Sequence, residues 1–203
     1  FVVVAPEFPR PEFPTANEYN LGNVFTAEGT KRPASSWSFA AIENLFDVVV
    51  SDLASNATGY TLYGHSAGSQ FVHRFLYYMP DARVSQFIAA NAGWYTLPEF
   101  DVVYPYGLLG AGIDENSLRT ALSRNVTVLL GDQDIDTEGD SLRRTPEAME
   151  QGSNRFSRGQ FFFERAATIA QDLGVDFNWE LLVVPGADHD NGKMAIGAAS
   201  LIP

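Results

Sequence analysis

The stretch YTLY-GHSAG-SQFVHRFLYYM, residues 60–79, joins a short strand pattern to a helical pattern through a glycine-bounded turn. Its first four residues predict a strand, whereas the apolar residues after the turn recur at helical spacing until Pro80. The turn matches the pattern GxSxG, with Gly64 and Gly68 placed where side chains would collide in so sharp a bend. We expect the bend to strain the backbone of Ser66 and to present its hydroxyl as a nucleophile.

Strand and helix patterns alternate along the rest of the chain. Strands are predicted over residues 1–5, 60–63, 84–91, 126–130 and 177–184, and helices over residues 36–53, 67–79 and 160–173 and after residue 191. Such alternation is typical of an α/β fold, a mostly parallel sheet flanked by helices on both faces. We predict a single domain over residues 1–203, in which residues 98–123, rich in glycine and aromatic residues, form a small lid or excursion.

The N-terminal run Phe1–Ala5 is continuous and apolar, which is typical of a strand buried on both faces. It begins without an initiator methionine or a polar leader, so we interpret the domain as N-terminally incomplete, without its first strands. A Pro-rich loop follows as far as about Pro33. Ser36 is the expected N-cap of the first helix, an amphipathic one that we expect to lie on the sheet.

The overall composition argues against several classes of partner. The chain carries 25 acidic against 13 basic residues, and because phosphate-rich partners are bound by Lys and Arg, we expect no nucleic acid. No apolar run approaches the roughly 20 residues of a membrane-spanning helix, so we expect no membrane partner. The absence of cysteine excludes disulfides, thiolate catalysis and Cys-ligated zinc, but it leaves the cellular compartment open.

A serine nucleophile needs a neighbouring base, and the chain has three histidines. His65 lies inside the turn, where its side chain should point away from Ser66, and His73 lies on the following helix, where a packed or surface histidine is expected. His189 instead follows a buried-strand pattern at residues 181–184, in a loop at the carboxyl end of a strand. That edge carries the active site in open α/β sheets, so we predict His189 as the base.

The third group should be a carboxylate that orients the imidazole. Several follow the strand at residues 126–130, and we take Asp134 as the first choice, Asp132 as the second and Asp136 as the third. Two other interpretations stay open, because this acidic run is also typical of a solvated loop or of a weak Ca²⁺ site, although it lacks the complete calcium-loop pattern.

The order serine, acid and histidine, with GHSAG, GDQD and PGADHD each after a strand, resembles the α/β-hydrolase superfamily over essentially the whole chain. Within it, the sequence is most similar to bacterial esterases of the polyhydroxybutyrate depolymerase and feruloyl esterase-like group. The resemblance implies that the acid occupies the last position of GDQD, which is Asp134. It also implies that the backbone N–H of Ala67 donates to the oxyanion, and that a second donor lies in a Gly-rich loop upstream of Val2–Pro6, outside this sequence.

Aromatic residues follow the strand at residues 84–91, at the same edge of the predicted sheet. Trp94 and Tyr95 are candidates for the wall of a substrate pocket, although capping the core is nearly as good an interpretation. A facing wall is predicted from four residues farther along. A cluster of four arginines is a candidate for binding a substrate carboxylate, but exposed pairing with the acidic loop is the preferred interpretation. These are Tyr104, Tyr106, Leu108 and Leu109 for the wall, and Arg143, Arg144, Arg155 and Arg158 for the cluster.

These residues together predict a serine hydrolase that cleaves carboxylic esters of small or polymeric substrates through an acyl-enzyme intermediate. The preference for esters rests on the subgroup resemblance, so a peptidase or amidase stays open, as does a catalytically silent domain that only binds. The predicted chemistry requires no cofactor and no metal.

Overall fold

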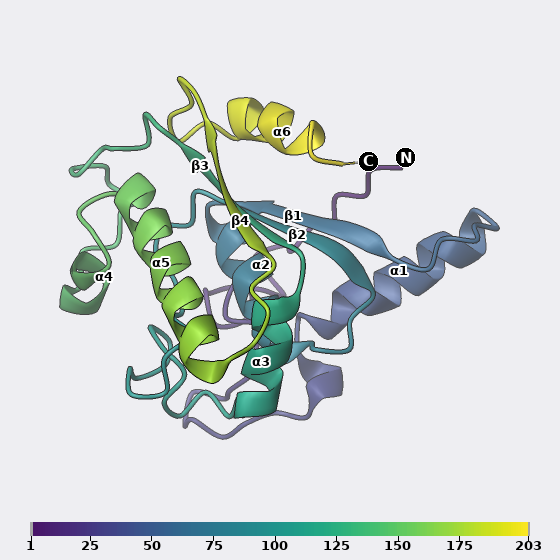
Figure 1. Cartoon of the computed structure of the whole chain (residues 1–203). Coiled ribbons are helices and arrows are strands. Elements are labelled where there is room, and N and C mark those ends of the chain that lie inside the picture. The colour runs from purple at the N-terminus through teal and green to yellow at the C-terminus, as the bar shows by residue number, and fades with distance from the viewer. Residues whose placement is uncertain (1, 203) are drawn as a thin grey trace.

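The computed structural model describes residues 2–202 and contains an α/β sheet of four parallel strands with helices around it (Figure 1). The strands are β1 (Tyr60–His65), β2 (Val84–Ala90), β3 (Val126–Gly131) and β4 (Trp179–Val184). The helices are η1 (Ala34–Ser36), α1 (Ala40–Asp52), α2 (Ala67–Tyr78), α3 (Glu115–Ser123), α4 (Pro146–Glu150), α5 (Arg155–Leu173) and α6 (Asn191–Ala199). Strand order follows chain order, and all three neighbouring pairs are parallel, which confirms the predicted fold class.

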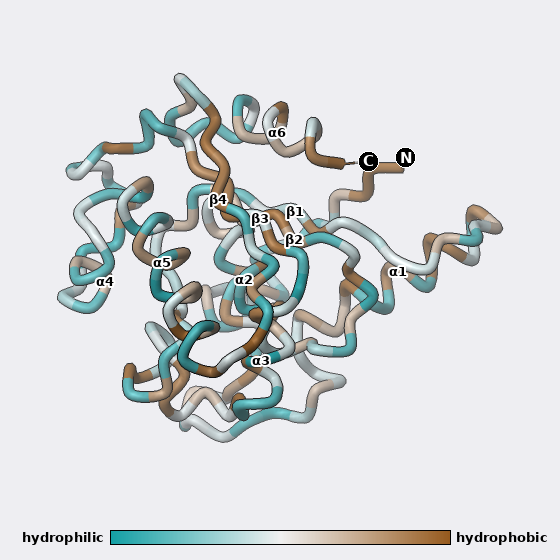
Figure 2. Tube along the Cα trace, in the orientation of Figure 1, coloured by the Kyte–Doolittle hydropathy of each residue, from teal (hydrophilic) through white to brown (hydrophobic). Residues whose placement is uncertain are grey.

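Helices cover both faces of the sheet. Helix α6 lies on one face, where Met194 packs with Ile88 and Leu129, whereas α2, α3 and α5 lie on the other (Figure 1). The larger core is on the second face and includes the buried rings of Phe75 and Phe162. Strand β4 is hydrophobic along much of its length, as Figure 2 shows, because both layers contact the sheet. Among residues 2–202, no helix combines the length and the apolar character that crossing a membrane requires.

The prediction of a buried strand at residues 1–5 is wrong for the residues that the structure describes, and Phe1 lies outside them. Val2, Val3 and Val4 are 65, 77 and 45% exposed and form no strand. An apolar run becomes a strand only where a neighbour satisfies its backbone groups, and no bridge joins this run to β1, which is the edge strand. The apolar pattern alone was therefore not sufficient to predict a strand here.

Helix α1 also departs from its prediction. It begins after Phe39 instead of Ser36, which belongs to the short helix η1, and no side chain caps it. Only Ile42 of this helix is buried, and its second half projects from the molecule (Figure 1), where Val48 is 54% exposed. In this half, Phe46 packs against Tyr60 of the edge strand β1, with ring centroids 4.8 Å apart, and Asp47 forms an ion pair with Arg83.

The segment of residues 98–123, expected to form a small lid or excursion, lies between β2 and β3 in the chain. Its first part is irregular, and Glu99 forms an ion pair with Arg165 of α5. Its last part is α3, which Asp114 caps by accepting a hydrogen bond from the backbone N–H of Ser117 at 2.8 Å. Because α3 packs against α2 and α5, this segment extends the helical layer beside the sheet.

The glycine-bounded turn behaves differently at its two ends. A Cβ on Gly64 would come within 2.2 Å of the carbonyl oxygen of Gly68, so the predicted collision holds there. A Cβ on Gly68 would meet only the Tyr19 hydroxyl at 3.7 Å, an ordinary contact, so the prediction of a collision at this end is wrong.

Replacing Gly64 by alanine should therefore lower the free energy of unfolding by about 3 kcal/mol, because the backbone of the turn has to move. Gly68→Ala is the matched control, and we expect it to change the stability by less than about 1 kcal/mol. Urea denaturation of both variants measures the difference, and equal losses would contradict this description of the turn.

Candidate active site

Ser66 is held in a backbone conformation that non-glycine residues rarely adopt, with φ 57° and ψ −114°. It stands between β1 and α2 as the N-cap residue of the helix, although its side chain makes no capping hydrogen bond. Its backbone N–H donates to the carbonyl oxygen of Ala90 at 2.9 Å, which ties the turn to β2. The backbone strain expected at Ser66 is present, and its hydroxyl makes no hydrogen bond to the helix.

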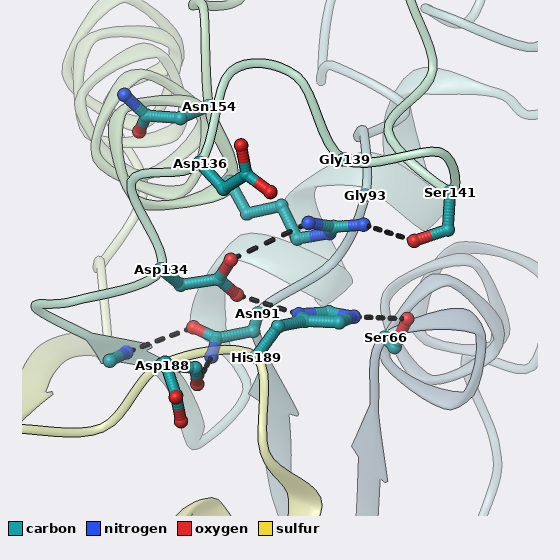
Figure 3. Close-up of polar contacts among 12 residues, drawn as sticks. Ser66, Asn91, Gly93, Asp134, Asp136, Gly139, Ser141, Asn154, Asp188 and His189 are labelled. Atoms are coloured by element: carbon teal, nitrogen blue, oxygen red, sulfur yellow. Dashed lines mark hydrogen bonds and ion pairs between the residues drawn. The ribbon is translucent and has the colours of Figure 1, made fainter.

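Two hydrogen bonds connect Ser66 to the histidine and the carboxylate chosen from the sequence (Figure 3). Nε2 of His189 lies 2.9 Å from Oγ of Ser66, and Nδ1 of the same ring lies 2.7 Å from Oδ2 of Asp134. The three residues follow the carboxyl ends of β1, β3 and β4, so the parallel sheet brings them to one edge. Such an arrangement allows the imidazole to accept the serine proton while the carboxylate holds its other nitrogen.

Asp134 is 1% exposed, and its second oxygen has a partner of its own. Nη1 of Arg155 lies 3.5 Å from Oδ1 of Asp134, and Nη2 of the same guanidinium donates to Oγ of Ser141 at 2.9 Å. Arg155 and Arg158 are both buried, so the expectation of an exposed arginine cluster is wrong for these two residues. Their guanidinium groups are buried because they bond to backbone and side-chain oxygens of the loops that they cross.

The other two carboxylates considered for this role point elsewhere. Oδ1 of Asp132 accepts the backbone N–H of Gly186 at 2.7 Å, and Oδ1 of Asp136 accepts that of Glu138 at 2.8 Å. Both therefore stabilise loop structure. Within residues 2–202, no group of three or more histidine or acidic side chains is arranged to hold a metal ion.

The ring of His65, which was expected to point away from Ser66, lies beside the ring of the base. The centroid of its ring is 4.7 Å from that of His189, with the two rings tilted by 38°. Burial, followed by the proximity of His189, lowers the pKa of His65 to about 4. His73 is buried inside the fold, where its Nε2 accepts the backbone N–H of Thr96 at 3.0 Å.

The lowered pKa of His65 should make stability depend on pH. Between pH 6.5 and about 4, the unfolded chain binds a proton at this residue that the folded chain does not, so stability falls as the pH falls through this window. We expect His65→Phe to flatten the profile, with a smaller loss of stability than the wild type between pH 7.5 and 4.5. Urea denaturation at both pH values measures this, and parallel profiles would contradict it.

The two aromatic candidates for the substrate wall are buried. Tyr95 is 0% exposed, and its ring stacks on Phe162 with centroids 4.4 Å apart. Trp94 is 5% exposed, and the guanidinium groups of Arg74 and Arg143 both pack against its ring, with Cζ atoms 4.2 and 4.9 Å from the ring centroid. This differs from the expected wall, because residues at the end of a buried strand pack under the loops that leave the sheet. Tyr95 is therefore part of the core.

Comparison with solved structures places this geometry in a family. The chain is 45% identical to poly(aspartic acid) hydrolase-1 from Sphingomonas sp. KT-1, with a TM-score of 0.95, 97% of this chain and 75% of that chain being covered. It is 38% identical to LpqC, a poly(3-hydroxybutyrate) depolymerase from Bordetella parapertussis, with a TM-score of 0.91 and coverage of 97% and 66%. The chain belongs to the α/β-hydrolase superfamily. Its hydrolase-type neighbours support hydrolase activity, and the resemblance drawn from GHSAG, GDQD and PGADHD is confirmed.

A more distant α/β hydrolase shows the fold alone. An IroE-like serine hydrolase from Shewanella oneidensis is 12% identical, with a TM-score of 0.50 and coverage of 92% of this chain and 55% of that chain. No protein-family model and no curated protein matches the sequence.

Sequence reasoning missed three residues beside the site of this α/β hydrolase. Arg155 was grouped with exposed charges, His65 was expected to point away from Ser66, and Asn91 was interpreted only as the end of a strand. A signal existed for Asn91, since a polar residue at the carboxyl end of a buried parallel strand lies at the edge where the active site forms. For Arg155 no such signal existed, because an arginine in a polar segment of sequence is usually exposed to solvent.

Proposed function

We propose that this protein is a serine hydrolase that cleaves carboxylic esters through Ser66, His189 and Asp134, with an acyl-enzyme intermediate. The observation that carries the proposal is the continuous pair of hydrogen bonds, 2.9 and 2.7 Å long, from the serine hydroxyl through the imidazole to a buried carboxylate. A free hydroxyl is a weak nucleophile at neutral pH, and this pairing is what activates it.

In the proposed reaction, Oγ of Ser66 attacks the ester carbonyl carbon while Nε2 of His189 takes the hydroxyl proton. Asp134 holds Nδ1–H of the ring and stabilises the imidazolium that forms, and Arg155 holds the second oxygen of that carboxylate. The C–O bond to the alcohol then breaks as His189 returns the proton to the leaving oxygen. A water molecule, deprotonated by His189, hydrolyses the acyl-enzyme and releases the acid.

The negative charge on the carbonyl oxygen requires donors in the transition state. Ala67 is the first residue of α2, so its backbone N–H has no acceptor inside the helix and is available at the positive end of the helix dipole. We propose Ala67 as one oxyanion donor.

An amide substrate is the second candidate, and the structural neighbour that is 45% identical gives it weight. That neighbour is named for poly(aspartic acid), in which amide bonds join the units, whereas the 38% identical neighbour is named for poly(3-hydroxybutyrate), a polyester. Both names describe polymers, which favours a polymeric substrate for this chain as well.

Hydrolysis of matched substrates separates these functions. We would measure kcat/KM for a short-chain p-nitrophenyl ester, the p-nitroanilide of the same acid, and soluble oligomers of 3-hydroxybutyrate and of aspartic acid. The reference is the ratio of the two rates in hydroxide-catalysed hydrolysis, which measures the greater chemical reactivity of the ester. The proposal predicts that the ratio of kcat/KM for the ester to that for the anilide exceeds this reference. Preferential cleavage of the anilide or of the aspartic acid oligomer would establish an amidase, and no turnover of any substrate by folded protein would favour a domain that only binds.

A further inference from the structure

Asn91 occupies an unusual position immediately after β2. It is completely buried and has φ 47°, a left-handed conformation that asparagine tolerates better than most residues. Its backbone N–H donates to the carbonyl oxygen of Leu129 in β3 at 3.1 Å, and the preceding residue, Ala90, accepts the backbone N–H of Ser66. Asn91 is therefore connected to the turn that carries the serine and to the strand that leads to the acid.

The side-chain amide of Asn91 bridges the two loops that carry the acid and the base (Figure 3). Its Oδ1 accepts the backbone N–H of Gly131 at 2.9 Å, and its Nδ2 donates to the backbone carbonyl oxygen of Asp188 at 3.3 Å. Gly131 ends β3 directly before the loop of Asp134, and Asp188 directly precedes His189. Because one partner only donates and the other only accepts, the orientation of the amide is fixed, and only a side chain with both functions satisfies both partners.

The two loops approach each other closely at this point. The ladder between β3 and β4 ends at the pair Gly131 and Val184, so the loops beyond it have no regular strand pairing. A Cβ on Gly131 would lie 2.3 Å from the carbonyl oxygen of Ala187, which shows how little space separates them. A hydrogen bond from the backbone N–H of Gln133 to that same oxygen, at 2.9 Å, ties them on the other side. Asn91 adds the connection to β2 and, through it, to the serine.

We propose that Asn91 is a positioning residue that sets the distance between Asp134, His189 and Ser66, an inference that rests on the proposed function of these three residues. Its side chain hydrogen-bonds to Gly131 and Asp188, whereas the serine hydroxyl is hydrogen-bonded to His189. Asn91 therefore acts through the two loops. Loosening the bridge displaces the imidazole relative to both of its partners. A displacement of about 1 Å in such a site costs on the order of 10²-fold in rate.

Two variants and one control test this role. Asn91→Gly accepts the left-handed backbone but removes both side-chain hydrogen bonds, and Asn91→Asp keeps the shape but sets an acceptor against the carbonyl oxygen of Asp188. We expect each to lower kcat by about 30-fold, with KM changed less than about threefold. Asn178→Gly is the matched control, because it removes a 2.7 Å hydrogen bond to the carbonyl oxygen of Ser123 at the opposite edge of the sheet. The control should keep the kcat of the wild type.

A double-mutant cycle distinguishes positioning from a general loss of stability. In the Asp134→Asn background, where the carboxylate no longer orients the ring, Asn91→Gly should lower kcat less than about threefold. An equal loss in both backgrounds, or an unchanged kcat in a folded Asn91→Gly protein, would overturn the proposal. If Asn91→Gly does not fold, Asn91→Asp provides the same comparison.

A spectroscopic readout separates this inference from the proposed function. The proton of His189 that is hydrogen-bonded to Asp134 gives a downfield ¹H resonance that does not depend on turnover. We expect Asn91→Gly to shift or broaden this resonance while Asn178→Gly leaves it in place. A wild type that hydrolyses nothing would contradict the proposed function, whereas an unchanged resonance in Asn91→Gly would contradict the role of Asn91.

Discussion

Replacing Ser66 by alanine is expected to lower kcat/KM for an ester by a factor of about 10⁴ to 10⁶, the largest effect of any single substitution in this chain. The variant removes Oγ and its hydrogen bond to His189, so no nucleophile remains to form the acyl-enzyme. Steady-state hydrolysis of a short-chain p-nitrophenyl ester at neutral pH measures the loss. Thermal unfolding should show a folded protein, because the hydroxyl makes no capping hydrogen bond to the helix.

Ser69→Ala is the matched control for this substitution. Ser69 lies one helical turn farther on in α2, is completely buried, and its hydroxyl has no hydrogen-bond partner among the described residues. We expect its kcat/KM to stay within about threefold of the wild type. Ester hydrolysis that survives in a folded Ser66→Ala protein would contradict the assignment of the nucleophile.

The second large effect is expected for Asp134→Asn, which should lower kcat by about 10³ to 10⁴-fold. The amide fits the same space, but it presents either a donor to Nδ1 of His189 or a neutral acceptor that stabilises the imidazolium poorly. It also leaves the buried guanidinium of Arg155 without its carboxylate, so stability should fall along with the rate. Kinetics under conditions where the variant is completely folded isolate the effect on the reaction.

Asp136→Asn and Asp132→Asn test the other two carboxylates of the same loop. Asp136 is exposed and Asp132 bonds to the backbone of Gly186, so each variant should keep kcat within about tenfold of the wild type. A loss of about 10³-fold in either variant, with Asp134→Asn active, would move the acid to that residue.

The elements nearest the site were the ones that the sequence predicted well. Residues 60–79, with a strand, two glycines and a helix closed by proline, form β1 and α2 within two residues of the predicted bounds. The strand predicted at residues 126–130 and its acidic loop were found for the same reason, since local pattern and the rules for parallel sheets point to the same edge. Asp134 was less certain, because three carboxylates share its loop; it was the first choice among them, and the last position of GDQD in the family resemblance implied the same residue.

One difference from the predicted elements, the start of α5, could have been predicted from the sequence. Helix α5 begins at Arg155, five residues before the predicted start, and a capping box formed by Asn154 and Ser157 marks that boundary. This pair predicts a helix start, because the side chain of each residue accepts a hydrogen bond from the backbone N–H of the other. The predicted start followed the apolar stripe alone, which begins later.

Other departures depend on contacts that no local pattern contains. The apolar residues 2–5 lack a strand partner within residues 2–202, and Val48 of α1 is 54% exposed because its helix lies at the edge of the sheet. Arg155 and Arg158 are buried because loops distant in the sequence surround them with oxygens, for example the carbonyl oxygen of Arg143 beside Nη2 of Arg158 at 2.8 Å. Tertiary structure, not composition, decides whether such a charge is solvated.

Reaction of the folded protein with a fluorophosphonate, followed by intact mass measurement and peptide mapping, tests the central claim most directly. The proposed mechanism predicts a single adduct on Ser66, formed by native protein, absent after denaturation, and slowed by about 10³-fold or more in His189→Ala, because the imidazole no longer accepts the proton. An adduct on another residue, equal labelling after denaturation, or no labelling of the folded wild type would contradict it.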